Sequence, residues 1–287
     1  MVTVEELRSI LPSICTAETS LSPEGWTREN PLYGHCAVVS ALAQDLFGGI
    51  LLRGSLEGTP YAEMRSHYVN GLPSGVEDFT APQFVNGYPD LKLEERTRAY
   101  VLGNERTKQR YKELAWRFSR TIAPSPMFDD TIYRGCFEAA LESDCQKFHV
   151  GCVIKQGGTT IVATANTKNP ILEGMCTPTC IRLGITSRTE SMLGACDHAE
   201  ERALDYLIDN RIDPATCEFY VAGFAPGGIP GKRASPEFTC LRCANQLVRR
   251  HLKAINVECG DAWNAITAVD ALKQSVAYAL QQKKAYV

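Results

Sequence analysis

Two short motifs in the last third of the chain combine side chains that bind a soft divalent metal. Cys240 and Cys243 stand two residues apart at the start of a predicted helix, so both thiolates can reach one ion. His198 opens an earlier predicted helix, and Glu200 follows it by two positions. One imidazole and two thiolates leave a fourth tetrahedral position open for water, the arrangement that distinguishes catalytic from structural zinc.

Glu200 is predicted to stand near that water without binding the metal. Two thiolates weaken zinc as a Lewis acid, and two helix N-termini directed at the site supply partial positive charge that compensates. Zinc lowers the pKa of bound water from ~16 towards ~7, and a neighbouring carboxylate can take the proton as hydroxide attacks. The same carboxylate can return protons to a ring nitrogen and a departing amine, so one residue serves as base and acid.

The order H-A-E, then C-x-x-C, behind a helix and a β-hairpin, resembles the zinc-dependent cytidine deaminase superfamily over about residues 127–265. His149–Ile154 resembles the first strand of that family, and Ala163–Asn166 resembles its second strand. The resemblance implies a zinc-dependent hydrolytic deaminase of an amino-substituted nucleobase, nucleoside or nucleotide. It implies Zn²⁺ as the cofactor, Glu200 as the proton shuttle and two sets of contacts: the metal ligands His198, Cys240 and Cys243, and the substrate contacts Asn166, Ala199 and Val150.

The sequence departs from the family pattern immediately before the first cysteine. The family usually has proline there, whereas this chain has Thr239 and its nearest proline is Pro236. The geometry of this turn is therefore left open by the sequence. The Pro- and Gly-rich insertion 226–236 is expected to border the pocket and to influence specificity.

Two alternatives to a small-molecule deaminase stay open at this point. Cys196 lies two residues before His198, and as a fourth thiolate it would close the site into a zinc-stapled interaction module without catalysis. A deaminase acting on RNA or single-stranded DNA would use basic residues near the site, which are Lys232, Arg233, Arg242, Arg249, Arg250 and Lys253. Cys176 and Cys180 form a weaker CxxxC, for which reduced thiols, a loop clip or a second metal site are all open.

The N-terminal region carries a second arrangement of reactive side chains. Cys36 follows Gly34 closely and opens an apolar helix, whose dipole favours the thiolate, and His67 and Asp78 could complete a Cys-His-Asp catalytic site. The segment resembles the bacterial YunG-like family in its G-x-C-A run, its D-x-F-G-G run, its H-Y pair and its D-x-T pattern. In the alternative, Cys36 is simply buried and the other two residues bond the backbone.

These motifs must be positioned by a succession of helices and strands. Residues 94–118 alternate charges with apolar residues, which is typical of a helix pair or a broken amphipathic helix. After it we expect helices and strands in alternation: a helix at 129–145, strands at 149–155 and 160–165 joined by Gly157 and Gly158, a helix at 198–209, a strand at 217–223, a helix at 240–252, a strand at 254–259 and a helix at 266–283. Short strands between helices indicate a layered α/β domain.

Composition limits the class of protein. The 287 residues carry 30 basic and 33 acidic side chains, so the net charge of -3 does not suit a chain that coats phosphate backbones. The proline-rich stretch 119–127 predicts a boundary between two domains, 1–120 and 121–287. We therefore predict an α/β protein: a C-terminal three-layer cytidine deaminase-like α/β/α domain, preceded by a smaller α+β domain of papain- or transglutaminase-like type.

The sequence also gives expectations about location and partners. No apolar run is long enough for a membrane span, and the N-terminus lacks the features of a secretory signal peptide, so we expect a cytoplasmic protein. In a reducing compartment its 12 cysteines indicate metal binding, catalysis or burial rather than disulfides. The expected partner is a small amino-heterocycle substrate in preference to nucleic acid, with no membrane, and a homodimer is compatible with the resemblance.

Overall fold

The structure is a computed structural model that describes residues 2–171, 180–181, 196–231 and 239–284. The chain divides into two compact units, Met1–Ile122 and Ala123–Val287. None of the helices in the described ranges is long and apolar enough to cross a membrane.

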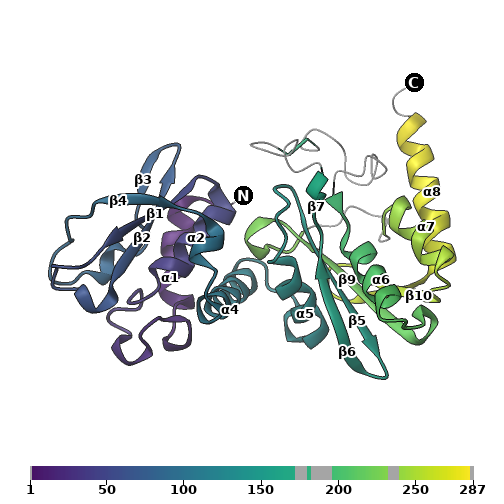
Figure 1. The fold of residues 1–287 in the computed structure, drawn as a ribbon, viewed down its shortest axis with the longest axis horizontal. Helices are drawn as coiled ribbons and strands as arrows, with labels where there is room; N and C mark the ends of the chain where they lie inside the picture. The colour runs from purple at the N-terminus through teal and green to yellow at the C-terminus, as the bar shows by residue number, and fades with distance from the viewer. Residues whose placement is uncertain (1, 172–179, 182–195, 232–238, 285–287) are drawn as a thin grey trace. The chain divides into compact units, whose positions relative to one another are not determined.

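The first unit places helices beside a small antiparallel sheet (Figure 1). The four strands lie in the order β3-β2-β1-β4, and neighbouring strands run antiparallel. The elements in chain order are α1 (Val4–Ile14), α2 (Cys36–Phe47), β1 (Ile50–Ser55), β2 (Ser66–Leu72), β3 (Gly75–Glu77), β4 (Leu93–Arg96), α3 (Arg98–Val101) and α4 (Glu105–Ile122).

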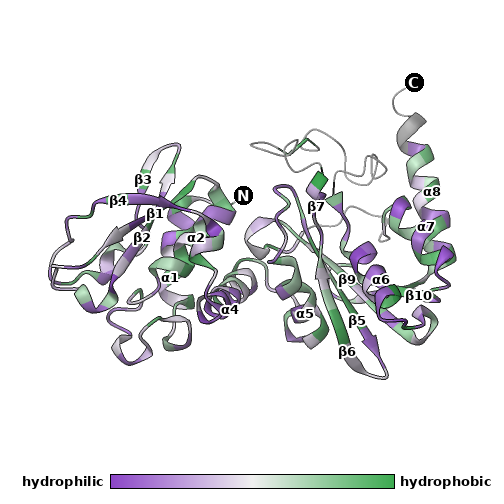
Figure 2. Cartoon of the chain, in the orientation of Figure 1, coloured by the Kyte–Doolittle hydropathy of each residue, from purple (hydrophilic) through white to green (hydrophobic). Residues whose placement is uncertain are grey.

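Helices α3 and α4 of the first unit pack against α2, and α1 packs against α4. Helix α2 is apolar on most sides and has Val38, Val39 and Leu42 fully buried, as expected for a central helix. Helix α4 is hydrophilic over most of its surface in Figure 2, but Leu114 and Phe118 on its other face are fully buried. Helices α3 and α4 agree with the helix pair predicted for residues 94–118. The first residues of that range, 94–96, belong to strand β4 instead. The papain- or transglutaminase-like type predicted for this unit is not confirmed by the fold.

The second unit is built on a five-stranded mixed sheet in the order β11-β10-β9-β5-β6. β5 pairs antiparallel with β6 and β9, while β9 and β10 are parallel. The elements in chain order are α5 (Thr131–Ala140), β5 (His149–Gln156), β6 (Thr159–Ala165), β7 (Thr167–Lys168), β8 (Cys196–Asp197), α6 (Ala199–Asp209), β9 (Cys217–Phe224), α7 (Leu241–Arg249), β10 (Ala254–Glu258), β11 (Trp263–Thr267) and α8 (Ala268–Lys284).

Helices cover both faces of this sheet, which confirms the predicted three-layer α/β/α architecture (Figure 1). Cys152 and Ile154 of β5 point into a core formed with Ala203 of α6 and its neighbours. The other face receives α5, which approaches β5 so closely that a Cβ at Gly151 would lie 1.8 Å from the carbonyl oxygen of Cys136. Only glycine permits this contact between the helix and the strand.

The β-hairpin between β5 and β6 forms where the sequence predicts it. Gly157 and Gly158 have φ angles of 57° and 82°, the left-handed conformation that a two-residue type I′ turn requires. The short strand β11 was not predicted, because its last residues were assigned to the following helix. β11 pairs with β10 through five residue pairs in an antiparallel hairpin, whose short connection contains Gly260 with a φ of 88°.

Candidate metal centre

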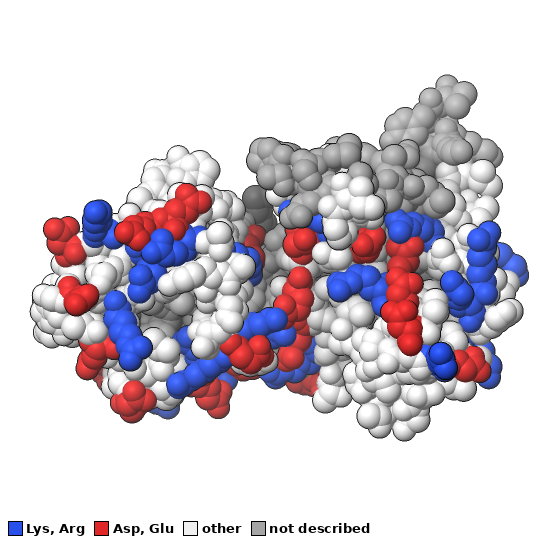
Figure 3. Space-filling view, in the orientation of Figure 1, with Lys and Arg blue, Asp and Glu red and all other residues white. Residues whose placement is uncertain are grey.

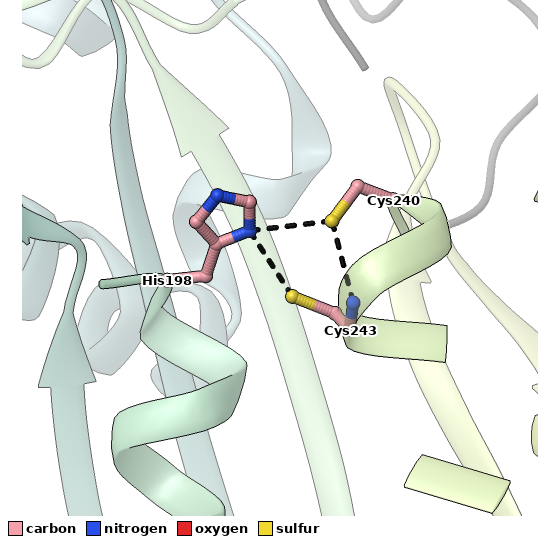
Figure 4. A group of neighbouring side chains, drawn as sticks. All are labelled: His198, Cys240 and Cys243. Carbon is pink, nitrogen blue, oxygen red and sulfur yellow. Dashed lines mark hydrogen bonds between the residues drawn. The ribbon is translucent and has the colours of Figure 1, made fainter. Parts of the chain in front are cut away.

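Three potential metal ligands meet where two helices begin. His198 is the N-cap of α6 and Cys240 is the N-cap of α7, so both helix N-termini are directed at one place. The Nδ1 atom of His198 lies 3.1 Å from the Cys243 sulfur and 3.2 Å from the Cys240 sulfur (Figure 4). These three side chains are the group of potential metal ligands that is compact enough to hold an ion among the described residues. All their ligand atoms lie within 4.8 Å of one another.

The donor set fits a zinc ion. Zn–N and Zn–S bonds of about 2.0 and 2.3 Å in a tetrahedral site place nitrogen and sulfur roughly 3.5 Å apart. The observed separations of 3.1 and 3.2 Å are slightly shorter, so a small outward adjustment of the side chains accommodates the ion. The sulfurs and the imidazole converge on one point although they come from separate helices. Soft thiolate and neutral imidazole donors favour zinc over magnesium or calcium.

The electrostatics of the cluster favour one ionised thiol. A hydrogen bond from Cys243 and the nearby His198 outweigh burial and hold the pKa of Cys240 well below its usual value. Burial, then the hydrogen bond to Cys240 and the charge of Cys240, raise the pKa of Cys243 far above its usual value. Burial alone would lower the pKa of His198, but hydrogen bonding to Cys240 and the surrounding negative charge raise it to about 9. The three side chains by themselves therefore pair an anionic Cys240 with a protonated His198, and a bound zinc ion would displace the protons of His198 and Cys243.

Glu200 lies in the first turn of α6 and is only 6% exposed. Its Oε1 atom accepts a hydrogen bond of 2.6 Å from the hydroxyl of Thr239, the residue directly before Cys240. The carbonyl of Thr239 in turn accepts a hydrogen bond of 2.8 Å from Ser275 on α8. The carboxylate is thus held between the starts of α6 and α7 by a threonine that is itself fixed to a third helix.

A second link joins the same two helix starts. Glu201 accepts a hydrogen bond from Arg242 at 2.5 Å, and its other oxygen accepts one from the backbone amide of His198 at 3.2 Å. Arg242 also donates to the carbonyl of Cys196 at 3.3 Å. Residues next to the ligands, rather than the ligands themselves, therefore fix the separation of α6 and α7.

The predicted substrate contacts surround the end of the β5–β6 hairpin. Asn166 is buried, and its side-chain amide accepts from the backbone of Val150 at 2.6 Å and donates to Phe148 at 2.9 Å. Ala199 is fully buried at the start of α6, and its carbonyl accepts a hydrogen bond from Thr164. Asn166 therefore fastens the two strands together, which leaves one amide hydrogen and one carbonyl lone pair for other partners.

The other cysteines near the site that the structure describes do not join the cluster. Cys196 is buried in β8, where its side chain is hydrogen bonded to that of Cys145, and it is not part of the compact ligand group, so it is not the fourth thiolate that a closed zinc staple would need. Cys180 is buried, whereas Cys176 lies outside the described residues, as does the last part of the insertion 226–236, namely 232–236.

In the first unit, the structure brings Cys36, His67 and Asp78 together. His67 Nε2 lies 2.7 Å from Asp78 Oδ2, and the side chains of His67 and Cys36 are hydrogen bonded. The alternative in which these residues bond only the backbone is therefore wrong, although Cys36 is indeed nearly buried, with 8% of its surface exposed.

Residues 3–123 match the family model described as YunG protein. The chain is also 30% identical over 100 residues to the uncharacterized protein YunG of Bacillus subtilis (strain 168). The aligned region covers 34% of this chain and 79% of that protein. The chain belongs to the YunG family.

A second family model matches this YunG-family chain beyond the YunG region. Residues 127–259 match the family model for the cytidine and deoxycytidylate deaminase zinc-binding region. A crystal structure of cytidine deaminase from Burkholderia pseudomallei is similar at 16% identity, over 48% of this chain and 90% of that chain, with a TM-score of 0.33. The matched region and the His/Cys/Cys cluster within it establish Zn²⁺ as the cofactor of the second unit.

Several residues of this YunG-family chain take part in the two clusters without having been predicted. Thr239 was noted only as a departure from the family pattern, yet it bonds Glu200. Glu201 was not singled out, although its spacing from the N-cap is that of a capping box. Gln83, which contacts His67 in the first unit, lies sixteen positions from it and has no local pattern that would reveal the contact.

Proposed function

We propose that the second unit is a zinc-dependent hydrolytic deaminase of an amino-substituted nucleobase, nucleoside or nucleotide. The observation that supports this most is the buried Glu200 carboxylate, held by Thr239 beside the His198, Cys240 and Cys243 cluster. A purely structural zinc site has no use for a buried acid in this place, since an unneeded buried carboxylate destabilises the fold.

In this proposal His198, Cys240 and Cys243 hold the ion, and Glu200 moves the protons. Zinc bound there supplies a Lewis acid that makes water acidic enough to react near neutral pH. Glu200 accepts a proton from the attacking water and delivers it to the ring nitrogen of the substrate. It then transfers the second proton to the departing amine, so that water and the C–NH₂ group become a carbonyl and ammonia.

The charges of the described surface support a small substrate over nucleic acid. Acidic and basic side chains alternate over the face shown in Figure 3 without an extended region of one sign. Of the six basic residues expected to contact a polynucleotide, Arg242 is paired with Glu201 at 2.5 Å, and Lys232 and Arg233 lie outside the described residues. Arg249, Arg250 and Lys253 remain, and these three supply fewer than the roughly 6–10 phosphate contacts of a tight polynucleotide complex.

The variant E200Q tests this function. We expect zinc content to stay at about one per chain while ammonia release from the preferred substrate falls by at least ~1000-fold, because the amide cannot shuttle protons. Ammonia release would be measured across bases, nucleosides, nucleotides and single-stranded oligonucleotides. D205N is the matched control, since it removes an exposed carboxylate from the same helix. Activity retained in E200Q, or activity confined to oligonucleotides, would contradict the proposal.

A further inference from the structure

The first unit holds a cluster of reactive side chains that the proposed deamination does not use. Cys36 is the first residue of α2, and its sulfur lies 3.9 Å from the backbone carbonyl of Ser66, next to His67 on β2. Helix α2 has 12 residues, and its N-cap, His35, makes no side-chain bond to the first turn. The amide groups of that turn therefore remain available to stabilise negative charge at or near the sulfur.

His67 is placed between the thiol and a carboxylate. Its Nε2 atom lies 2.7 Å from Asp78 Oδ2, so the hydrogen bond to Cys36 falls to Nδ1, which Gln83 also contacts. The ring is only 1% exposed and packs edge-on against Phe84 with centroids 4.7 Å apart. Packing and the bond to Asp78 leave the ring little freedom, and an Nε2–H bond to the carboxylate makes Nδ1 the proton acceptor.

The carboxylate has its own supports. Asp78 Oδ1 accepts hydrogen bonds from the Thr80 backbone amide at 2.9 Å and from the Thr80 hydroxyl at 3.2 Å. The hydroxyl of Tyr88 bonds the same carboxylate. Burial opposes the charge, but the bond to His67 and these donors hold the pKa of Asp78 below its usual value. Asp78 is thus ionised and fixed in the position that orients His67.

Gln83 connects the histidine to the segment that leads into α2. Its Nε2 atom lies 3.3 Å from His67 Nδ1, and its Oε1 atom accepts a hydrogen bond of 3.3 Å from the backbone of Gly34. Gly34 has a φ of +75°, and a Cβ there would lie 2.5 Å from the Ser20 hydroxyl. A buried glutamine therefore sets the distance between His67 and the beginning of the helix that carries Cys36.

The charges around the sulfur favour the thiolate. Burial raises the pKa of Cys36, but hydrogen bonding to His67, its charge and the Tyr68 amide outweigh burial and lower it. Burial also lowers the pKa of His67, yet the bonds to Asp78 and Cys36 raise it to about 9. The guanidinium of Arg110, 6% exposed, adds positive charge near Cys36, and its Nε has no hydrogen-bond partner among the described residues.

We propose that Cys36, His67 and Asp78 form a second catalytic site, in which Cys36 is the nucleophile of an acyl-transfer reaction on an ester, thioester or amide. His67 takes the thiol proton, and the sulfur attacks the acyl carbon. The bond to the leaving oxygen, sulfur or nitrogen breaks as His67 returns the proton to that atom. Water then hydrolyses the thioester, with His67 again taking and returning a proton, and releases a carboxylic acid.

Alkylation of the full chain with iodoacetamide, followed by peptide mass spectrometry, tests the nucleophile. Cys36 should react at least ~10-fold faster than Cys15 at pH 7, because burial raises the pKa of Cys15 in the same unit far above the usual range. Between pH 6 and 9 the rate at Cys36 should rise less steeply than that of an ordinary thiol. The titratable and charged side chains that face Cys36 and His67, and so influence this pH dependence, are Tyr68, Asp78, Tyr88 and Arg110.

Variants and an acyl probe complete the test. In H67A, alkylation of Cys36 at pH 7 should fall by at least ~10-fold, while D78N should give an intermediate loss. p-Nitrophenyl acetate should leave an acetyl group on Cys36 in the wild type and none in C36A, with the thermal unfolding temperature checking that each variant folds. Any one of three results would overturn the proposal. These are alkylation of Cys36 no faster than that of Cys15, an alkylation rate that H67A leaves unchanged in a folded chain, and the absence of acetyl-Cys36. E200Q should leave all these results unchanged, which separates this site from deamination.

Discussion

At the scale of single residues, the site in the second unit depends on a hydroxyl that occupies the position where the resemblance expects proline. Thr239 donates to Glu200 at 2.6 Å while its carbonyl is held by Ser275. Proline has no side-chain donor, so in a proline-containing turn the acid must be oriented in another way. This chain therefore uses a hydrogen bond to place its proposed proton shuttle.

Replacing Thr239 with valine tests that role. T239V keeps the shape of the side chain and removes a hydrogen bond to a charged group, worth about 1.5–3 kcal/mol. We expect kcat for deamination to fall by about 10- to 100-fold, with KM and zinc content little changed. T239S restores the hydroxyl and should recover most of kcat. A loss of zinc in T239V, or failure of T239S to recover activity, would mean that Thr239 supports the fold rather than Glu200.

The metal ligands could be predicted from sequence because each motif is local. C-x-x-C places two sulfurs one helical turn apart, and H-x-E places a metal ligand at the N-cap and a carboxylate in the first turn of a helix. The contacts of Thr239 and Gln83 could not be predicted, since their partners are 39 and 16 residues away and no periodic pattern links them. Such contacts depend on the tertiary fold.

At the scale of elements, the second unit depends on the close approach of α5 to β5. Gly151 permits the Cys136 carbonyl to lie where a Cβ would otherwise stand, at 1.8 Å. The sequence showed the strand correctly but gave no reason for a glycine within it. The reason is the packing of a helix onto the strand, which the amino-acid pattern of either element alone does not contain.

The substitution G151A should therefore destabilise the second unit. Because the clash is with backbone, α5 must move away from the sheet, and overpacking of this kind costs about 1–3 kcal/mol or more. Urea unfolding of the full chain would measure the loss. G135A is the control, because its Cβ would meet only a Val153 methyl group at 3.2 Å and alanine favours the helix. Equal stability of G151A and the wild type would show that α5 is not held as described.

At the scale of the whole molecule, the chain joins two units that each contain a core of their own. Helix α2 is buried in the first unit, while the cluster that includes Phe219 and Leu247 fills the second. The sequence predicted two domains, 1–120 and 121–287, and the proline-rich stretch 119–127 contains the division between the two compact units. The two candidate catalytic clusters lie in different units, so each can be disabled separately.

Removal of zinc should lower the thermal stability of the second unit and leave that of the first unit unchanged. Separate cores favour two thermal transitions in calorimetry of the full chain, and a chelator such as 1,10-phenanthroline should lower only the transition of the second unit, by several degrees. The substitution L42A in the core of the first unit identifies the other transition, because it should lower that one alone. A single transition, or equal lowering of both by the chelator, would contradict the separation.

The two helices that begin at the metal centre have a consequence beyond catalysis. α6 and α7 present like poles to each other, each equivalent to roughly half a positive elementary charge. Like poles repel, and anionic sulfur lies between them. A relative without the proposed reaction would still be stabilised by Cys240, since a neutral replacement would leave this repulsion unopposed. The presence of this sulfur in a relative would therefore be a poor guide to whether that relative is a deaminase.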